Sequence, residues 1–188
     1  MAEVNPPLYE EHQLSQWKLS KLIGDPITKG VRGSTGYFIE EVHWKEATPT
    51  PFDLSMAKCN FQIYEKGLLM RCFYSNKQVL IPIAFSQLRA IEVNGGQETI
   101  PKHFSLMRFL VKSGVSMRYA RYASHFRFGR GLGHLKGYKV EPLEIKLTTE
   151  FVTFQLTASG YDHTSQLIFF KSLNLGERLK IEYDSKIS

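Results

Sequence analysis

Acidic residues are missing from one long stretch of this sequence. Between Glu98 and Glu141 there is no aspartate or glutamate in the 42 residues from Thr99 to Val140. The same stretch holds nine of the 24 lysines and arginines, which leaves 15 basic residues against 18 acidic ones elsewhere. The formal charge of +6 therefore belongs to one segment. Such asymmetry indicates an anionic partner, which could be an acidic protein, an anionic membrane surface or nucleic acid.

Cysteine and long apolar runs are also scarce. Cys59 and Cys72 are the only cysteines and form no CxxC pair, and the six histidines are scattered without metal-ligand spacing. No stretch approaches 18 uninterrupted apolar residues, and MAEVNPPLYEEHQ, with three acids, is not typical of a secretion signal. We therefore expect reduced thiols, no metal and no cofactor. The expected location is the cytoplasm, with peripheral contact to a membrane as an open alternative.

The length and composition are typical of one folded domain with a large insertion. The chain has 188 residues, of which 43% are hydrophobic and 13% aromatic, enough for a sizeable core. We expect three parts: a helix and a glycine-rich linker at 1–36, one β-barrel-like domain at 37–98 and 141–188, and the basic insertion at 99–140.

Alternating apolar and polar residues predict most of the β-structure. Strands are expected at YFIEEVHW, AKCNFQIY, LLMRCFY, VLIPI, RAIEV, LEIKL, FVTFQLT and SQLIFFK. A two-residue loop at Lys66-Gly67 would place Phe61 opposite Cys72, with Cys59 one diagonal step away. We also expect a helix over about 8–23 that ends at Gly24, and a short helix in the tail, weakened by Gly176. Because short turns join the strands, the predicted fold class is mainly β (α+β), an antiparallel barrel or sandwich.

Part of this pattern resembles the bacterial pleckstrin-homology-like (PH-like) domain. In FQIYEKGLLMRCFYSNKQVLIPIAFSQLRAIEV, a strand, a glycine turn and a second strand lead to Ile81-Pro82, and the short turn at Ser86-Gln87-Leu88 starts the next strand. FVTFQLTASGYDHTSQLIFFKS is similar to the last two strands of the family. The resemblance covers about 70 of the 188 residues. It implies a barrel closed by a C-terminal helix, whereas this tail is short and contains a glycine, and the insertion has no counterpart in the family.

The resemblance also bears on the ligand. PH domains that hold inositol phosphates tend to use a basic loop between their first two strands. The candidate loops here are Glu65-Lys66-Gly67, which is very short, and KEATPTPFDLSM, which has one lysine against two acids. Many PH-like domains are protein-interaction scaffolds, and this function stays open.

The first half of the basic insertion has helical spacing. In HFSLMRFLVKSGVSMRYARYASHF, one stripe at 100° per residue holds seven apolar or aromatic residues. They are Phe104, Met107, Val111, Val115, Tyr119, Tyr122 and Phe126. Ser113-Gly114 could break the helix in two. Packing on the barrel with the basic groups extended to water, membrane contact and nucleic-acid contact are the three interpretations.

The second half of the insertion combines arginine, rings and glycine. In HFRFGRGLGHLKGYK, arginine beside exposed rings would suit phosphate contact and base stacking, although an ordinary solvated loop is the alternative. GRGLGH lacks the third glycine of a dinucleotide fingerprint, and GxxxxGK[ST] is absent. The predicted anion- and partner-binding residues are Arg118, Arg121, Arg127, Arg130, Lys136, Lys139, Tyr122 and Phe128.

The sequence offers no arrangement for catalysis. Asp162, His163 and Ser165 are neighbours in a predicted turn, but a catalytic triad depends on the fold and not on adjacency. Glu40 and Glu41 are consecutive strand residues, which we expect on opposite faces of the sheet. We therefore predict that the protein is not an enzyme. We expect a non-catalytic binding or scaffolding module that contacts an acidic protein or an anionic membrane surface through the insertion. The alternatives are an RNA- or DNA-binding protein that uses the same insertion, and a small-ligand carrier or unrecognised enzyme.

Overall fold

The structure, a computed structural model, divides the chain into two compact units. Unit 1 comprises Met1–Gly96 and Pro142–Tyr183, and unit 2 comprises Gln97–Glu141 and Asp184–Ser188. The described residues are 8–45, 53–96, 98–99, 106–115, 119–120, 122–123, 139–160 and 163–182. The segment at 1–36, expected as a separate part, belongs to the same unit as the sheet.

Unit 1 is built on one mixed sheet of nine strands in the order β1-β5-β4-β3-β2-β10-β9-β6-β11. The strands are β1 (Tyr9–Glu10), β2 (Tyr37–Trp44), β3 (Lys58–Tyr64), β4 (Gly67–Tyr74), β5 (Lys77–Ala84), β6 (Leu88–Gly95), β9 (Leu143–Thr149), β10 (Val152–Ala158) and β11 (Leu179–Glu182). The mainly β class is confirmed, and seven of the eight predicted strands are present. The eighth, SQLIFFK, is a helix.

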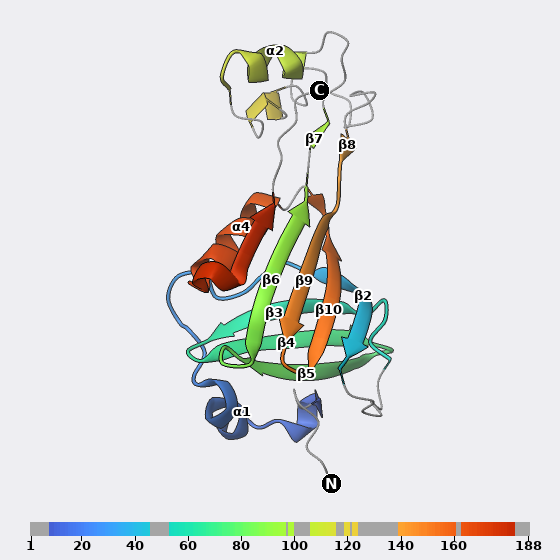
Figure 1. The fold of residues 1–188 in the computed structure, drawn as a ribbon, viewed down its shortest axis with the longest axis vertical. Helices are drawn as coiled ribbons and strands as arrows, with labels where there is room; N and C mark the ends of the chain where they lie inside the picture. Colours follow the sequence, from blue (N-terminus) through green and yellow to red (C-terminus); the bar gives the residue numbers. More distant parts are fainter. Residues whose placement is uncertain are drawn as a thin grey trace. The chain divides into compact units, whose positions relative to one another are not determined.

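The sheet bends at β2, so that the half formed by β3, β4 and β5 faces the half formed by β6, β9 and β10. β2 pairs with the beginning of β3 at Tyr37↔Cys59 and Phe38↔Lys58, and along the rest of its length with β10. The strands β3, β4 and β5 run across β6, β9 and β10 (Figure 1). The sheet is not closed into a barrel, because β1 and β11 form its two ends. Of the expected antiparallel barrel or sandwich, a closed barrel is therefore excluded, and the sheet is mixed instead of purely antiparallel, since β11 pairs parallel to β6.

Helix α4 (His163–Ser172) replaces the predicted last strand. Gln166, Phe169, Phe170 and Leu173 are buried and recur at the helical spacing i, i+3, i+4 and i+7, while Ile168 is exposed. The four apolar residues of LIFF are consecutive and do not alternate with polar ones, so the sequence could not distinguish a strand from a helix there. The short helix predicted in the tail is a single 3-10 turn at Gly176–Arg178, and the strand β11 follows it.

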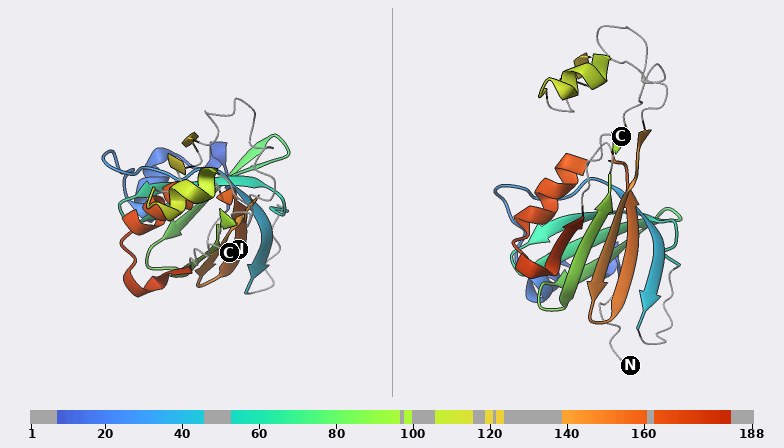
Figure 2. Two further views of the ribbon diagram at one scale, coloured as in Figure 1. Left: turned by 90° about the horizontal axis from the view of Figure 1, so that it is seen from above. Right: turned by 45° about the horizontal axis from the view of Figure 1, so that its top comes forward.

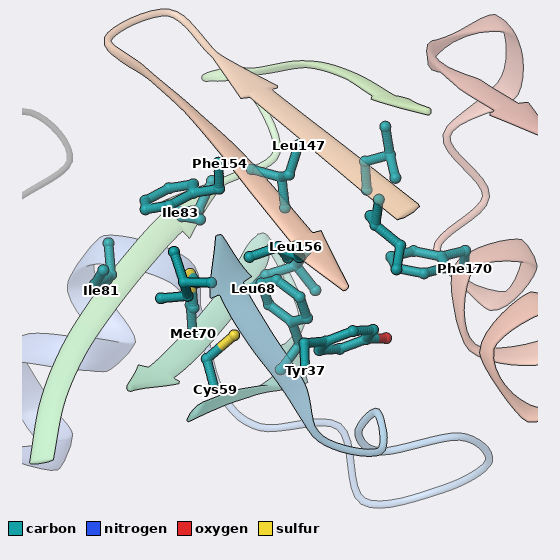
Figure 3. Close-up of a cluster of buried hydrophobic side chains, with 14 of the residues drawn as sticks. Tyr37, Cys59, Leu68, Met70, Ile81, Ile83, Leu147, Phe154, Leu156 and Phe170 are labelled. Carbon is teal, nitrogen blue, oxygen red and sulfur yellow. The ribbon is translucent and has the colours of Figure 1, made fainter. Parts of the chain in front are cut away.

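The interior of unit 1 lies between the two halves of the sheet. Side chains from both halves meet there (Figure 3), and they include six buried residues of the predicted strands. They are Cys59, Phe61, Ile63, Met70, Ile81 and Phe154. Helix α4 adds Phe169, whose ring lies 6.3 Å from that of Phe61, and Phe170, whose ring lies 6.3 Å from that of Tyr37. The helix lies beside the sheet in each view (Figure 2).

The hairpin of β3 and β4 has a different register from the predicted one. Its turn is Glu65-Lys66, so Tyr64 pairs with Gly67, Phe61 with Met70 and Cys59 directly with Cys72. Gly67 serves the packing and not the turn: a Cβ there would lie 2.4 Å from the carbonyl oxygen of Ile83 and 2.7 Å from Cγ2 of Ile23. Glycine permits this close approach of the backbone.

Helix α1 (Gln16–Ile23) covers part of the outward face of β3, β4 and β5. It is shorter than the predicted helix, because β1 and a 3-10 turn at Glu11–Gln13 precede it. Ser15 caps its first turn, and it stops as predicted at Gly24, with φ +82°. A second apolar cluster lies between this helix and the strands. It is composed of Leu14, Leu19, Ile23, Tyr64, Leu69 and Leu80.

Unit 2 contains a short ribbon and helical segments. β7 (Glu98–Thr99) pairs with β8 (Lys139–Val140), and α2 spans Leu106–Lys112. The predicted break at Ser113-Gly114 is confirmed: Val115 N–H donates to the Leu110 carbonyl at 3.0 Å, and Gly114 N–H, at φ +83°, donates to Val111 at 3.0 Å. This is the Schellman pattern, which ends a helix.

Candidate binding surfaces

Most of the predicted anion-binding residues lie outside the described residues. These are Arg118, Arg121, Arg127, Phe128, Arg130 and Lys136. Lys139 is in β8, and its backbone pairs with Thr99. Tyr122 lies in a helical segment with an exposed ring.

The described part of unit 2 presents aromatic rings to solvent. Phe109, Tyr119 and Tyr122 are each more than half exposed, whereas Ala120 is buried. Of the expected apolar stripe, Val111 and Val115 are half-buried, whereas Tyr119 and Tyr122 are exposed. Exposed rings among cations can stack on bases, pack against lipid headgroups or meet an acidic protein surface.

The outward face of β10, β9, β6, β11 and the part of β2 after Phe38 is mostly polar. One row crosses these five strands: Glu41, Gln155, Lys146, Glu92 and Lys180 are successive cross-strand partners. Lys146 and Lys180 lie 3.8 Å and 3.6 Å from the Glu92 carboxylate, and Arg89 pairs with Glu150. The cations of this face are thus matched by acids of the same face.

The outward face of β3, β4 and β5 is apolar where α1 covers it and partly apolar beyond. Phe38, Lys58 and Phe73 form a row across β2, β3 and β4, and all three are exposed. In the next row, Arg71 donates a hydrogen bond to Gln62 Oε1 at 2.8 Å. It also hydrogen-bonds Tyr64, which counteracts the rise in the Tyr64 pKa that burial causes. The sequence analysis missed this surface, although alternation placed Phe38 and Phe73 opposite the buried Tyr37 and Cys72.

Glu40 and Glu41 do not point to opposite faces of the sheet, as the sequence analysis expected. Gln155 pairs with Glu41 and Leu156 with Ile39, so Glu40 is the extra residue of a β-bulge. Both glutamates are therefore exposed instead of facing opposite sides. Glu41 accepts hydrogen bonds in an exposed cluster, at 2.8 Å from His43 Nε2 and 3.1 Å from Gln155 Nε2.

The other candidate catalytic residues are not brought together in the described part of the chain. His163 is the first residue of α4, Ser165 is exposed on that helix, and Asp162 lies outside the described residues. No cluster of three or more metal-ligating side chains occurs within the described ranges.

Two buried polar side chains of unit 1, Tyr37 and Gln166, hold helix α4 in place. Tyr37 OH donates to Gln166 Oε1, and Gln166 Nε2 donates to Thr35 Oγ1. Gln166 is fully buried, and burial also raises the Tyr37 pKa far above its usual value. Because a buried amide without partners would be costly, this chain of hydrogen bonds fixes the orientation of the helix. The chain links α4 to β2 and to the loop before it, so its role is structural.

The two thiols are free and buried. Burial raises the Cys72 pKa to about 12. The Cys59 pKa is also raised, mainly by burial and further by the neighbouring Cys72. Both groups are therefore protonated near neutral pH, which makes them poor nucleophiles.

Comparison with known proteins returns no relative: the chain matches no family model, no curated protein and no solved structure. Among the described residues, no helix is both long and apolar enough to cross a membrane. The proposed function therefore rests on the fold and the surfaces of this chain.

Proposed function

We propose that unit 1 is a PH-like domain. Three features support this assignment. β2, β3, β4 and β5 are consecutive neighbours, β5 contains Ile81-Pro82, and a short turn leads from it to β6. The resemblance implies a closing C-terminal helix, and α4 follows β10 and packs its rings against Tyr37 and Phe61. We therefore assign the closing helix of the family to α4, in a segment that the sequence analysis predicted as a strand.

We further propose that the protein is a non-catalytic binding module whose insertion, in unit 2, contacts an anionic partner. The observation behind this proposal is the absence of any acid over 42 residues that contain nine cations, together with exposed rings at Phe109, Tyr119 and Tyr122. The nearest acids along the chain are Glu98 and Glu141, which flank the run at its two ends. Rings beside such cations add contact area at low entropic cost.

The insertion is a better candidate than the usual lipid-binding loop of PH domains. The connection between β2 and β3 contains Lys45 and two acids, and Lys45 Nζ donates to the Thr149 carbonyl at 2.9 Å. The β3–β4 turn has only Glu65 and Lys66. Neither connection concentrates positive charge, so an inositol phosphate held there has little support. An acidic protein or an anionic membrane surface is the preferred partner of the insertion.

The test reverses three charges of the insertion. In the triple variant, Arg127, Arg130 and Lys136 are each changed to glutamate. Binding to phosphatidylserine vesicles, to single-stranded RNA, to duplex DNA and to polyglutamate is measured at 50 and 200 mM NaCl. We expect the parent to bind at least one of these polyanions with strong salt dependence, and the variant to lose at least tenfold in affinity.

A matched control changes Lys29, Lys66 and Lys171 to glutamate. These lysines are exposed in unit 1 and form no ion pair within the described residues. Three cations are replaced by glutamate in both variants, so the change in net charge is identical. We expect the control variant to keep most of the binding and both variants to melt like the parent. Preference for RNA or DNA over vesicles and polyglutamate would favour the nucleic-acid alternative. A parent that binds none of the four probes in a salt-sensitive way would contradict the proposal.

A further inference from the structure

Unit 1 has an exposed aromatic row that the binding role of the insertion does not use. Phe38, Lys58 and Phe73 are successive cross-strand partners on β2, β3 and β4. Their chain neighbours Tyr37, Cys59 and Cys72 are buried, so all three side chains point outward. Phe38 is 46% exposed and Phe73 is 47% exposed. Strand spacing places their backbones roughly 10 Å apart, with the lysine between them.

Met56 extends the apolar area of this row. Its backbone N–H donates to the Ile39 carbonyl at 2.7 Å, which fixes it beside β2, and its side chain is 75% exposed. Met56 also has φ +64°, an unfavourable conformation for a residue with a Cβ. The chain thus keeps a large apolar side chain in solvent at a strained position. Clusters of exposed apolar groups of this kind mark interaction surfaces more often than single residues do.

The charges of the row identify the kind of partner. Lys58 Nζ lies 5.5 Å from the centre of the Phe38 ring, and Arg71, in the next row, hydrogen-bonds the neutral side chain of Gln62. Within the described ranges neither cation forms an ion pair with a carboxylate, although Lys146, Lys180 and Arg89 of the polar face all do. The aromatic row therefore combines apolar area with two cations that form no ion pair within the described residues.

We propose that the aromatic row of Phe38, Lys58 and Phe73, with Met56 beside it, is a docking surface for an acidic, apolar segment of a partner protein. The partner's carboxylate would meet Lys58 and Arg71, and apolar side chains on either side of it would pack on the two rings. A charge that loses water at such a contact needs an opposite charge, whereas the rings supply most of the contact area. This surface is separate from the proposed anion contact of the insertion.

A peptide selection tests the proposal without knowledge of the natural partner. A phage library of random twelve-residue peptides is selected on the parent protein and counter-selected on a Phe38→Ser/Phe73→Ser variant. We expect the enriched peptides to share an aspartate or glutamate with a leucine, isoleucine or phenylalanine on each side. Enrichment of peptides without an acid, or of none that distinguishes the two proteins, would overturn the proposal.

The selected peptide then separates the row from the insertion. By fluorescence anisotropy, Lys58→Glu should weaken its binding at least tenfold, whereas Lys171→Glu on α4 should leave it within twofold. The triple variant at Arg127, Arg130 and Lys136 should also bind normally, so failure here and failure of the proposed function are distinguishable. Equal binding by the parent and by Lys58→Glu would contradict the proposal.

Two further measurements address other occupants of the row. If analytical ultracentrifugation shows a parent dimer that Phe38→Ser/Phe73→Ser abolishes, the occupant is a second copy and the proposal is wrong. If phosphatidylserine vesicles bind the parent but not this variant, the occupant is a membrane and the proposal is equally wrong. Thermal melting controls for folding, and Lys58→Glu, which changes one exposed side chain, keeps the test valid should the double variant unfold.

Discussion

The two outward faces of the sheet in unit 1 differ in how they meet water. Across β10, β9, β6, β11 and the part of β2 after Phe38, the outward side chains are mostly polar, and Glu92 pairs with two lysines of neighbouring strands. Across β3, β4 and β5 the outward positions include Leu69 and Leu80, which α1 covers, and Phe73, which it does not. One face needs no cover, whereas the other is covered over part of its area only.

This difference shows what the N-terminal segment contributes to the fold. In both halves the side chains that face the interior are apolar. If apolar and polar residues alternated along every strand, the outward side chains of both halves would therefore be polar. The strands β4 and β5 instead carry apolar residues on both sides, which is typical of strands buried on both faces. Helix α1 is thus part of the folded domain and not an appendage. The exposed remainder at Phe38 and Phe73 is where a partner could supply further cover.

The largest expected effect comes from the covered face. Leu69→Ala on β4 removes a buried outward side chain beneath α1, and we expect a loss of about 3 kcal/mol in the free energy of unfolding. The matched change Lys146→Ala, outward on the central strand of the polar half, should cost within about 0.5 kcal/mol. Urea unfolding measures both. Equal losses would mean that the two outward faces do not differ as described.

The interior shared by both halves gives an intermediate effect, at alkaline pH. The folded pKa of Cys72 is raised to about 12 from 9.0, so the folded protein holds this proton more tightly than the unfolded chain does. The resulting stability is complete below about pH 9 and is lost as the pH rises toward 12. We expect the free energy of unfolding to fall by up to about 1.4 kcal/mol per pH unit for this group.

Urea titrations at pH 8, 9 and 10 measure that slope, and Cys72→Ala should make it shallower. Cys59 adds to the slope in the same direction, because its pKa is also raised. Arg89→Gln, on the polar face, is the control and should leave the slope unchanged. A parent whose stability stays constant from pH 8 to pH 10 would show that the thiols meet solvent, contrary to their burial.

The smallest effect is expected on the polar face. Glu92→Gln removes the acid that Lys146 and Lys180 share, and exposed ion pairs of this kind contribute about 0–1 kcal/mol each. We expect a loss of less than about 1 kcal/mol at low salt, and a smaller one in 1 M NaCl because of screening. A salt-independent loss of several kcal/mol would indicate a packing role for Glu92 and would weaken the comparison of the two faces.

Sequence patterns predicted the strands of unit 1 where alternation was clear, as at Cys59, Phe61 and Ile63. They failed where the period was hidden or locally broken. The apolar run before Phe169 and Phe170 has no alternation, and the bulge at Glu40 adds a residue that shifts the period by one. The hairpin register was missed because Gly67 suggested a turn, while its actual role is contact with Ile23, which is far away in sequence.

The candidate binding surfaces were predictable to different degrees. The charge asymmetry of the insertion is a property of composition and could be read directly from the sequence. The aromatic row could not, because it requires the registers that bring Phe38, Lys58 and Phe73 from three strands into line. Residues 124–138, which hold four of the predicted contacts, lie outside the described part of the chain.

The position of unit 2 in the chain has a consequence for the order of folding. β6 and β9 are antiparallel neighbours, and the 45 residues Gln97–Glu141 make up nearly all of the connection between them, which is, in topological terms, the loop of a single hairpin. Closing a loop of that length in place of a two-residue turn costs roughly 3 kcal/mol of chain entropy. The hairpins of β3, β4 and β5 need only local contacts, and β6 must wait for distant partners on both of its sides. In pulse-labelled hydrogen exchange, the amides of β4 should therefore be protected before those of β6, which would make the apolar half of the sheet the template on which the polar half assembles.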